Sequence, residues 1–576
     1  QHILKRTSEG IKKLNALYAK DKEDIFYFYH RMSQYNETDN QWTGWERKRG
    51  ALMEFNELLL GSEVTSFRHY SDNAMPSGRI KYIITLDSDT QLPLDMAKKM
   101  IGTMAHPLNT PIISEETGVV VDGYGLVQPR VSFDVESANQ SVFSKIFTGQ
   151  EGIDPYASAI SDVYQDFFGE GIFTGKGIYD LEVFNTVLKD AVPDQAVLSH
   201  DLLEGSYVRA ALVSDLELID AYPTKYNSYM ARLHRWIRGD WQLIPWLRKR
   251  VYNRNNQKVK NPLSAVSKWK IADNLRRSLV APSVLILMLF GVSVLPGSSA
   301  FWVVLSLLPL CTPLIIQAIT SILAKGDHIK RHISGFFGLK ASFFQFVLGV
   351  IFLPYQSFRI LNAIIVSLYR VLISKKKMLE WITSDDSDKN QKNTFIAYLS
   401  AMWISVLIGG LFAVLSYFNK PEDLFWGIFF FVFWACSPLI AYYVSLDEKG
   451  KLQTLEADEN KLLRQYARKT WHYFDTFANK ENNYLAPDNF QEDPSRGVAA
   501  RTSPTNIGLG LLATLSAKDM GYIGNIELKL SLSRTVKTIE SLPMWYGHLF
   551  NWYDTKTLMP LFPRYVSTVE IGRAHV

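Results

Sequence analysis

The sequence predicts an α/β domain, then a membrane-spanning helical region, then a second polar helical region. Strand-like and helix-like runs alternate over residues 1–270, which favours a largely parallel sheet with helices on both faces. Long apolar runs dominate residues 279–445, and residues 446–570 are polar again. The mean hydropathy of -0.04 conceals this division, because it averages soluble and membrane-like segments.

The first region supplies the elements of the sheet and its covering helices. We expect strands over residues 25–29, 82–86, 118–121, 125–129 and 216–220. We expect helices over residues 5–20, 45–60, 94–104, 156–168, 180–189 and 200–210.

Four apolar runs predict transmembrane helices. They lie at residues 279–296, 300–324, 394–418 and 424–446. Each is close to or above the roughly 20 residues that cross a bilayer core. Lys and Arg gather on the flanks, whereas the connectors 297–299 and 419–423 hold one Lys between them, so both soluble regions are expected in the cytoplasm. Helices buried in a soluble core are the alternative, which this charge asymmetry disfavours.

Residues 336–374 allow two interpretations. They form either a third hairpin that bends near Pro354 or an amphipathic helix at the membrane interface. The polar residues Gln356, Arg359 and Asn362 favour the interfacial helix, preceded by a short insertion.

Composition excludes some classes of protein. The net charge of +5 is small for 576 residues and no basic stripe is present, so a nucleic-acid partner is not expected. Both cysteines, Cys311 and Cys436, lie in apolar runs and suit packing more than a disulfide or a metal. We expect a fragment of a longer protein, because the chain starts inside a helical pattern and residues 571–576 resemble translated sequencing adapter.

Two acids follow the apolar run Tyr82–Leu86. Asp87 and Asp89 are one residue apart, at the carboxyl end of the expected strand, where open α/β sheets bind ligands. Such a pair can hold Mg²⁺ or Mn²⁺, which in turn neutralises a nucleotide diphosphate. An ordinary Asp-rich turn is the alternative interpretation.

Two further motifs come later in the chain. Residues 173–179 place Gly175 and Gly177 in a turn before a helix, and glycines allow close approach of a ligand or serve a plain tight turn. Residues 198–205 place Asp201 in the first turn of a helix, where it is either a functional acid or a cap.

A fourth motif concentrates cations and indoles over residues 232–242. Arg235 can meet a diphosphate and Trp236 can stack on the face of a sugar. An aromatic belt at a membrane interface is the alternative.

In this order the motifs resemble a processive family 2-like glycosyltransferase of the GT-A type, with Asp-x-Asp, a glycine-rich loop, an acid at a helix start and an Arg-x-x-Arg-Trp box. Longer strings resemble the cyclic β-1,2-glucan synthase family over nearly all of residues 1–570. They include Gly-Trp-Glu-Arg-Lys-Arg-Gly (44–50), Thr-Gly-Lys-Gly-Ile-Tyr-Asp (174–180), Arg-Gly-Asp-Trp-Gln-Leu-Ile-Pro-Trp (238–246) and Arg-Thr-Ser-Pro-Thr-Asn-Ile-Gly-Leu (501–509).

The resemblance implies a domain organisation. Residues 1–270 would be a GT-A-like (Rossmann-like) α/β domain that lacks its N-terminal strand or strands. Residues 271–446 would be the transmembrane region, and residues 447–570 the start of a glucoamylase-like α/α toroid. The localisation that the resemblance implies is a bacterial inner membrane.

The resemblance also implies an activity: inverting transfer of glucose from UDP-glucose to a growing β-1,2-glucan. It makes Asp201 the general base, and Asp87 and Asp89 the ligands of Mg²⁺ or Mn²⁺. The expected donor-binding residues are Lys48, Arg49, Arg232 and Arg235. The expected acceptor-binding residues are Gly175, Lys176, Gly177 and Trp236. His200 and Arg232 replace the Glu and Gln of the common motifs, which is the form expected in this family.

Other functions stay open. One is another processive β-glycan synthase, and another is an inactive carbohydrate-binding membrane protein, which the intact acids and Arg235 disfavour. In residues 447–570, Asp554 and Glu492 are candidate sugar-binding or catalytic acids, or else a cap and a solvated side chain. Because parts of the family's full length are expected to be missing, the activity of this fragment by itself is an open question.

Overall fold

The computed structural model describes most of the chain and divides it into two compact units. The described residues are 2–19, 25–69, 80–148, 163–323, 328–380, 393–448 and 457–567. The first unit comprises residues 1–88, 99–214 and 221–448, and the second comprises residues 89–98, 215–220 and 449–576. Residues 571–576, the expected adapter sequence, lie outside the described part.

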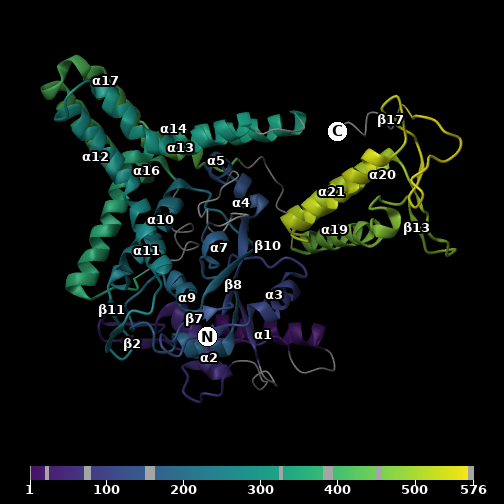
Figure 1. Ribbon diagram of the computed structural model, residues 1–576, viewed down its shortest axis with the longest axis horizontal. Helices are drawn as coiled ribbons and strands as arrows, with labels where there is room; N and C mark the ends of the chain where they lie inside the picture. The colour runs from purple at the N-terminus through teal and green to yellow at the C-terminus, as the bar shows by residue number, and fades with distance from the viewer. Residues whose placement is uncertain are drawn as a thin grey trace. The chain divides into compact units, whose positions relative to one another are not determined.

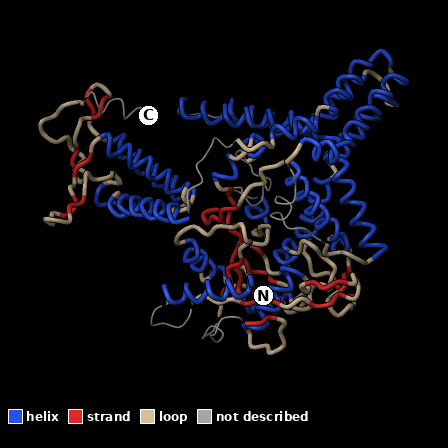
Figure 2. Tube along the Cα trace, turned by 180° about the vertical axis from the view of Figure 1, so that it is seen from behind, coloured by secondary structure: helices blue, strands red, loops and turns tan. Residues whose placement is uncertain are grey.

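A four-stranded sheet lies among the helices of the α/β region (Figure 2). Its strand order is β10 (Ala210–Asp220), β8 (Leu126–Phe133), β9 (Gly177–Asp180) and β5 (Tyr82–Thr85). Strand β9 runs antiparallel to both β5 and β8, so the expectation of a largely parallel sheet is wrong at these two pairs. The sequence did not predict β9, because four residues that begin with glycine show no strand periodicity.

Helices occur where the sequence predicts them in this region. They are α1 (His2–Tyr18), α2 (Arg47–Leu59), α3 (Met96–Met104), α8 (Leu181–Leu188) and α9 (Asp201–Tyr207), with α7 (Val163–Phe168) covering the described part of the expected helix over 156–168. Additional helices are α4 (Val135–Asn139), α5 (Val142–Phe147), α10 (Tyr226–Gln242) and α11 (Ala265–Ser278). Short antiparallel pairs join β1 (Tyr29–Arg31) to β4 (Phe67–His69), and β2 (Gln34–Asn36) to β3 (Gln41–Thr43).

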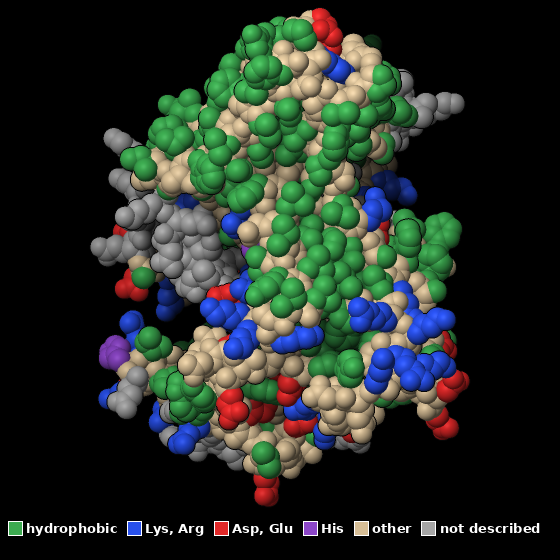
Figure 3. Space-filling view, turned by 90° about the vertical axis from the view of Figure 1, so that its left-hand side faces the viewer, with side chains coloured by type: hydrophobic (Ala, Val, Ile, Leu, Met, Phe, Trp, Pro, Cys, Tyr) green, Lys and Arg blue, Asp and Glu red, His purple; other side chains and the backbone are tan. Residues whose placement is uncertain are grey.

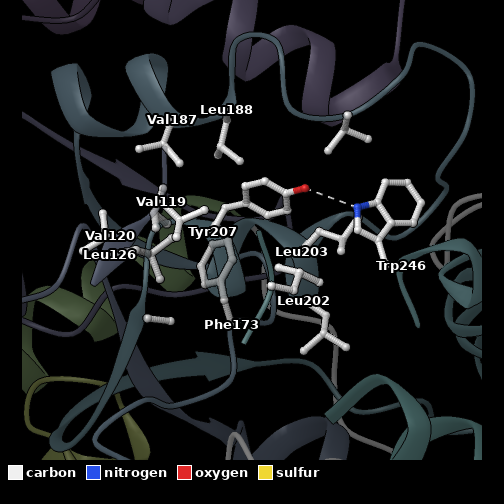
Figure 4. Packing of buried hydrophobic residues seen from close by; sticks show 14 of the residues in the cluster. Val119, Val120, Leu126, Phe173, Val187, Leu188, Leu202, Leu203, Tyr207 and Trp246 are labelled. Carbon is white, nitrogen blue, oxygen red and sulfur yellow. Dashed lines mark hydrogen bonds between the residues drawn. The ribbon is translucent and has the colours of Figure 1, made fainter. Parts of the chain in front are cut away.

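Helix α9 is anchored by the core beneath it. Leu202 and Leu203 point into a cluster that includes Phe173, as Figure 4 shows. Tyr207 accepts a hydrogen bond from Nε1 of Trp246 at 3.4 Å in the same cluster. Each buried leucine contributes roughly 1.5–3 kcal/mol, so the start of α9 is held firmly.

Long apolar helices follow in the first unit (Figure 1). They are α12 (Val280–Ser293), α13 (Ser299–Leu323), α14 (His328–Tyr369), α16 (Phe395–Asn419), α17 (Leu424–Ala435) and α18 (Ser437–Val444). Within the described residues, four segments are long and apolar enough to cross a membrane: 299–319, 339–374, 395–419 and 421–444. Helices α11 and α12, bent by 41° at their junction, make a fifth if they are counted as one span.

The structure refines two expectations for the membrane region. Helix α12, within the predicted span 279–296, has 14 residues and is about 21 Å long, so it is long enough for a bilayer core of about 30 Å only together with α11. Pro354 lies inside the continuous helix α14, which excludes the hairpin, the less favoured of the two interpretations of residues 336–374. The length and hydropathy of residues 339–374 favour a crossing helix over an interfacial one.

Small residues allow these helices to pack closely. A Cβ atom at Gly427 would lie 2.8 Å from Cβ of Ser416, which fixes the approach of α17 to α16. Hydrophobic side chains gather on the face shown in Figure 3, with Lys and Arg side chains along part of its border. This is the division expected of a surface that meets lipid and its headgroups.

One lysine joins the turns of two helical hairpins. Lys420 is 8% exposed, and its Nζ donates hydrogen bonds to the carbonyl oxygens of Gly291, Leu295 and Gly297 at 2.8, 2.6 and 2.8 Å. Three carbonyls thus receive the only basic side chain that the sequence places in the two short connectors.

The second unit is mainly helical, as its polar sequence predicts. It contains α19 (Ala457–Phe477), α20 (Pro504–Asp519) and α21 (Asn525–Ser541), together with the short antiparallel pairs β13–β14 (Phe490–Gln491, Gly497–Val498), β15–β18 (Arg501–Thr502, Tyr553–Asp554) and β16–β17 (Met544–Trp545, His548–Leu549). A small core forms around Leu485, Ile507, Leu542 and Tyr553.

Candidate functional site

The antiparallel pairing of β5 and β9 brings two predicted site segments together. Its register joins Thr85 to Gly177. Two residues further along each chain, Asp87 follows β5 and Gly175 precedes β9. A parallel pair would have sent these segments to opposite edges of the sheet. The strand that sequence reasoning missed is therefore the element that assembles the site.

Asp87 lies between two lysines. Nζ of Lys48 is 2.5 Å from Oδ1 of Asp87 and donates to the carbonyl oxygen of Gly175 at 2.8 Å. Nζ of Lys176 is 3.3 Å from Oδ2. Burial raises the pKa of Asp87, but the two ammonium groups outweigh burial and hold this pKa below its ordinary value. Asp87 is therefore ionised at neutral pH.

Asp201 is the first residue of α9, and its carboxylate lies against Gly175. The φ angle of Gly175 is +91°, and a Cβ atom there would lie 2.8 Å from Oδ1 of Asp201. Glycine is thus required both for the backbone conformation and for space. The Asp201 side chain is 27% exposed, which leaves it accessible from one direction.

His200 and Glu204 flank this carboxylate. Nδ1 of His200 is 2.8 Å from Oε1 of Glu204 and 3.6 Å from Oδ1 of Asp201. Burial raises the pKa of Asp201, and although His200 lowers it, the net pKa is above its ordinary value. The carboxyls of Asp87 and Asp201 thus have opposite shifts, which suits a charge-binding role for one and a proton-accepting role for the other.

Arg49 is buried beneath the segment that leads to Asp201. Its Nη2 is 3.0 Å from Oε2 of Glu46 and 3.6 Å from Oδ1 of Asp194, and the residue is 4% exposed. The guanidinium therefore supports this segment. The role of Arg49 as a donor ligand stays a prediction.

Helix α10 supports the same segment from another element. Oε1 of Gln242 accepts a hydrogen bond from the backbone N–H of Leu198 at 2.6 Å, and Nε2 donates to the carbonyl of Met378 at 3.0 Å. A Cβ atom at Gly239 would lie 2.5 Å from Cβ of Ser199. The helix that carries the cation-rich motif thus packs directly on the segment before the candidate base.

The motif itself is partly exposed along α10. The guanidinium of Arg232 lies 4.9 Å from the centre of the Trp236 ring, so it occupies one face of the indole. Nε2 of His234 is 3.0 Å from Oδ1 of Asn362, and burial is the main cause that lowers the pKa of His234 to about 4. The contacts of Arg232 and Trp236 lie within the helix, and the ligand roles of these two residues and of Arg235 stay predictions.

Three other predicted residues differ in their surroundings. Asp89 is exposed in the turn after Asp87. Lys176, expected to bind the acceptor, is 6% exposed and faces Asp87. Its charge therefore lies beside a residue expected on the donor side. Gly177 is buried, and a Cβ atom there would lie 2.2 Å from the carbonyl oxygen of Val127, so this glycine permits the approach of β9 to β8. The ligand roles of these residues stay predictions.

Sequence reasoning missed two supporting residues. Gln128 is fully buried, and its Oε1 accepts hydrogen bonds from the backbone N–H and the hydroxyl of Thr174 at 2.9 and 3.1 Å, which holds the glycine turn. An amide inside an apolar strand was the available signal. Glu204 follows His200 by four residues, a spacing that places both side chains on one face of a helix.

In the second unit, Asp554 has a turn-forming role. Its Oδ1 accepts hydrogen bonds from the backbone N–H groups of Lys556 and Thr557 at 2.9 and 2.8 Å. The bonds from Thr557 are the main cause that lowers the pKa of Asp554. Glu492 is exposed. The structure thus favours the turn and the solvated side chain over catalytic acids.

The acids after β5 suit a hard divalent cation. Two carboxylates offer oxygen ligands and leave positions for water and phosphate oxygens, an arrangement that Mg²⁺ prefers. Because both oxygens of Asp87 face ammonium groups, a cation there would displace Lys48 or Lys176 from one of them. The donor set therefore fits Mg²⁺ or Mn²⁺, and an ammonium group displaced by the cation would meet phosphate.

These features define a site suited to chemistry on an anionic donor, with a separate proton acceptor, in a chain with several membrane-length helices. The chain is 40% identical to the cyclic beta-(1,2)-glucan synthase NdvB of Rhizobium meliloti (strain 1021). The alignment covers 99% of this chain and 20% of that protein, so the chain spans about one fifth of its relative.

Two other comparisons add less. No family model matches the chain. A crystal structure of a putative glucoamylase from Bacteroides fragilis NCTC 9343 is similar over 22% of this chain and 31% of that chain, at 23% identity and a TM-score of 0.19. That score is too low to show a shared fold, so the glucoamylase-like assignment of residues 447–570 stays a prediction.

Proposed function

We propose that the chain carries the glycosyltransferase part of a membrane-bound enzyme that transfers glucose from UDP-glucose to a growing β-1,2-glucan, with inversion. The observation that carries this proposal is the meeting of Asp87, Gly175 and Asp201 at one edge of the sheet. The similarity to a protein described as a cyclic β-(1,2)-glucan synthase supports the choice of polymer.

The donor side is formed by Asp87 with Lys48 and Lys176. The two ammonium groups bind the diphosphate of UDP-glucose and offset its negative charge. Mg²⁺ or Mn²⁺ held by Asp87 and Asp89 would add Lewis-acid neutralisation of the leaving UDP. Arg235, partly exposed on α10, is the next candidate to contact the diphosphate.

The acceptor side is formed by Asp201. Its carboxylate takes the proton of the acceptor's 2-hydroxyl, whose oxygen then bonds to the anomeric carbon. The bond from that carbon to the diphosphate breaks, and its electron pair leaves with UDP. A carboxylate whose pKa is raised accepts this proton more readily than an ordinary aspartate. In this proposal Gly175 and Trp236 contact the acceptor sugar.

The wider organisation is part of the same proposal. Residues 1–270 act as a GT-A-like domain and residues 271–446 as a membrane region with the soluble parts in the cytoplasm. The charge distribution and the four membrane-length segments support this arrangement in a bacterial inner membrane. Residues 447–570 would begin a glucoamylase-like α/α domain.

The test uses membranes that carry the full-length parent protein, radiolabelled UDP-glucose and Mg²⁺ or Mn²⁺, followed by linkage analysis of the polymer. We expect a 1,2-linked glucan that requires the metal and is lost in Asp87→Asn. Asp519→Asn, at an exposed position of α20, is the matched control and should retain activity.

Other outcomes would redirect the proposal. A polymer with another linkage would identify a different processive β-glycan synthase. Binding of glucan without release of UDP, from well-folded protein, would favour an inactive carbohydrate-binding role.

A further inference from the structure

A buried histidine lies between two carboxylates at the start of α9. His200 is 7% exposed, and its Nδ1 is 2.8 Å from Oε1 of Glu204 and 3.6 Å from Oδ1 of Asp201. All three side chains come from five consecutive residues, so a single turn of helix fixes their spacing. We call His200 and Glu204 the His–Glu pair.

The balance of charge in the site requires a cation at this position. Asp87 is matched by Lys48 and Lys176. Glu204 is only 3% exposed, and its Oε2 has no hydrogen-bond partner among the described residues. A buried carboxylate without a counter-charge is strongly disfavoured. The imidazole of His200 is the basic group in ion-pair range of Glu204.

We propose that the His–Glu pair positions the base: the imidazolium of His200, held by Glu204, keeps Asp201 ionised and fixes the direction of its carboxylate toward the acceptor hydroxyl. This inference rests on the proposed function, because it specifies how the base of that reaction is prepared. The pair exchanges no proton in the reaction and touches neither sugar, so both are positioning residues.

Charges from other elements act on the same groups. Those that face the pair or Asp201 are Lys48 and Arg49 of α2 and Asp87 after β5. Lys48 attracts Asp201, whereas Asp87 repels it. If His200 were neutral, burial and Glu204 would both favour protonated Asp201, which cannot act as a base. His200 thus acts together with Lys48 to keep the base ionised.

The activity test compares His200→Gln, Glu204→Gln and the double variant in the full-length parent. In His200→Gln we expect the acid limb of the kcat profile to move up by about one pH unit, with KM for UDP-glucose changed less than twofold. In the double variant the limb should return toward that of the parent, because the repelling charge of Glu204 is gone as well. The exposed substitutions His472→Gln and Glu115→Gln are matched controls.

A merely structural role would give a different result. It would lower kcat by the same factor at every pH and leave the limb in place, and the double variant would be worse than either single variant. Either observation would overturn the proposal.

A second measurement needs no activity. Burial lowers the pKa of His200, but Glu204 and Asp201 outweigh it, so the folded-state pKa lies above its ordinary value of 6.5. The resulting stability is fully present below pH 6.5 and is lost as pH rises through the folded-state pKa. We expect the melting temperature of the parent to exceed that of His200→Gln most below pH 6.5. A difference in melting temperature that does not depend on pH would overturn the proposed ion pair, even if the protein makes glucan.

The two tests separate failure of the pair from failure of the function. In one outcome the parent releases no UDP while the melting difference still follows pH as expected. In that case the ion pair between His200 and Glu204 is supported and the proposed reaction is wrong.

A bound divalent cation is the competing explanation of the cluster. Ligand atoms of His200, Asp201 and Glu204 lie within 4.8 Å of one another. Mn²⁺ binding, followed by electron paramagnetic resonance, should be unchanged in Glu204→Gln if the imidazolium is the counter-charge. Loss of a bound Mn²⁺ in both single variants would overturn the proposal and identify a metal site.

Discussion

The candidate site in the first unit and a charged cluster in the second use similar side chains in different ways. In the second unit, Oδ2 of Asp488 accepts hydrogen bonds from Nε and Nη2 of Arg501 at 3.1 and 2.8 Å, and Oδ1 accepts from Asn506 at 3.2 Å. Arg501 is 51% exposed and lies 4.8 Å from the centre of the Trp552 ring. Every oxygen of this carboxylate is paired within the unit.

In the site of the first unit, the carboxylates are not all paired with cations in this way. Asp87 has two lysines, whereas Asp201 and Glu204 have one histidine in ion-pair range. The pKa of one aspartate is lowered and that of the other raised. Fully paired ions contribute to local structure, whereas carboxyls of one site whose pKa values are shifted in opposite directions indicate chemistry. Four predictions test this distinction, in order of expected effect.

The largest effect is expected for Asp201→Asn. The amide cannot accept the proton of the acceptor, so the rate of glucan formation should fall by about 1,000-fold. Binding of UDP should stay near that of the parent, because the lysines and Asp87 are intact. Single-turnover assays with radiolabelled donor and a UDP titration measure the two quantities. A variant that still elongates glucan would show that the base is another residue.

Gly175→Ala should have the next largest effect. The new Cβ would lie 2.8 Å from Oδ1 of Asp201, so the carboxylate must move, and we expect activity to fall by about 100-fold, as displacement of a catalytic group by about 1 Å can cost. Gly61→Ala is a matched control: its φ is +96°, close to that of Gly175, but no atom lies within 4 Å of the added Cβ. Equal losses in both variants would assign the effect to backbone strain.

Lys176→Met tests the donor side. Removal of one cation beside Asp87 should raise the pKa of that carboxyl and weaken UDP binding by about tenfold, equivalent to about 1.4 kcal/mol. Calorimetric titration with UDP measures the change. Lys260→Met removes a lysine that is 82% exposed and should leave UDP affinity unchanged. An unchanged affinity for UDP in Lys176→Met, together with a raised KM for the acceptor, would support the acceptor-binding role that the sequence predicts for Lys176.

The smallest effect is expected for Arg501→Gln. An exposed pair is worth about 1 kcal/mol or less, so the melting transition of the full chain should move by less than about 3 °C and glucan formation should not change. Loss of activity in this variant would give the Asp488 cluster a function that its complete pairing does not suggest.

Several features could be predicted from the sequence because they depend on local patterns. The apolar run before Asp87, the first turn that contains Asp201 and the helix that carries Lys48 all occur where periodicity and composition place them. Their assembly could not be predicted, because it depends on the long-range antiparallel pairing of β9, a strand of four residues. The partner of Lys176 follows from the same register.

The buried groups show a second limit of sequence reasoning. Arg49 carries the charge of a donor ligand, yet burial against Glu46 gives it a supporting role that its residue type does not reveal. In the membrane region, hydropathy identified the apolar runs. The polar residues Gln356, Arg359 and Asn362 favoured an interfacial helix, whereas residues 339–374 are long and apolar enough to cross a membrane.

The bonds of Lys420 have a consequence for the order in which the membrane region is made. Its ammonium group donates hydrogen bonds to the carbonyl groups of Gly291, Leu295 and Gly297. The backbone N–H of Ser299 donates to Asp423 at 2.5 Å. More than 120 residues separate the two turns, so the first hairpin leaves the ribosome with these groups unsatisfied. The later hairpin therefore supplies hydrogen-bond partners that the turn of the earlier hairpin lacks. A chain that stops before residue 420 would insert the first two helices without these partners.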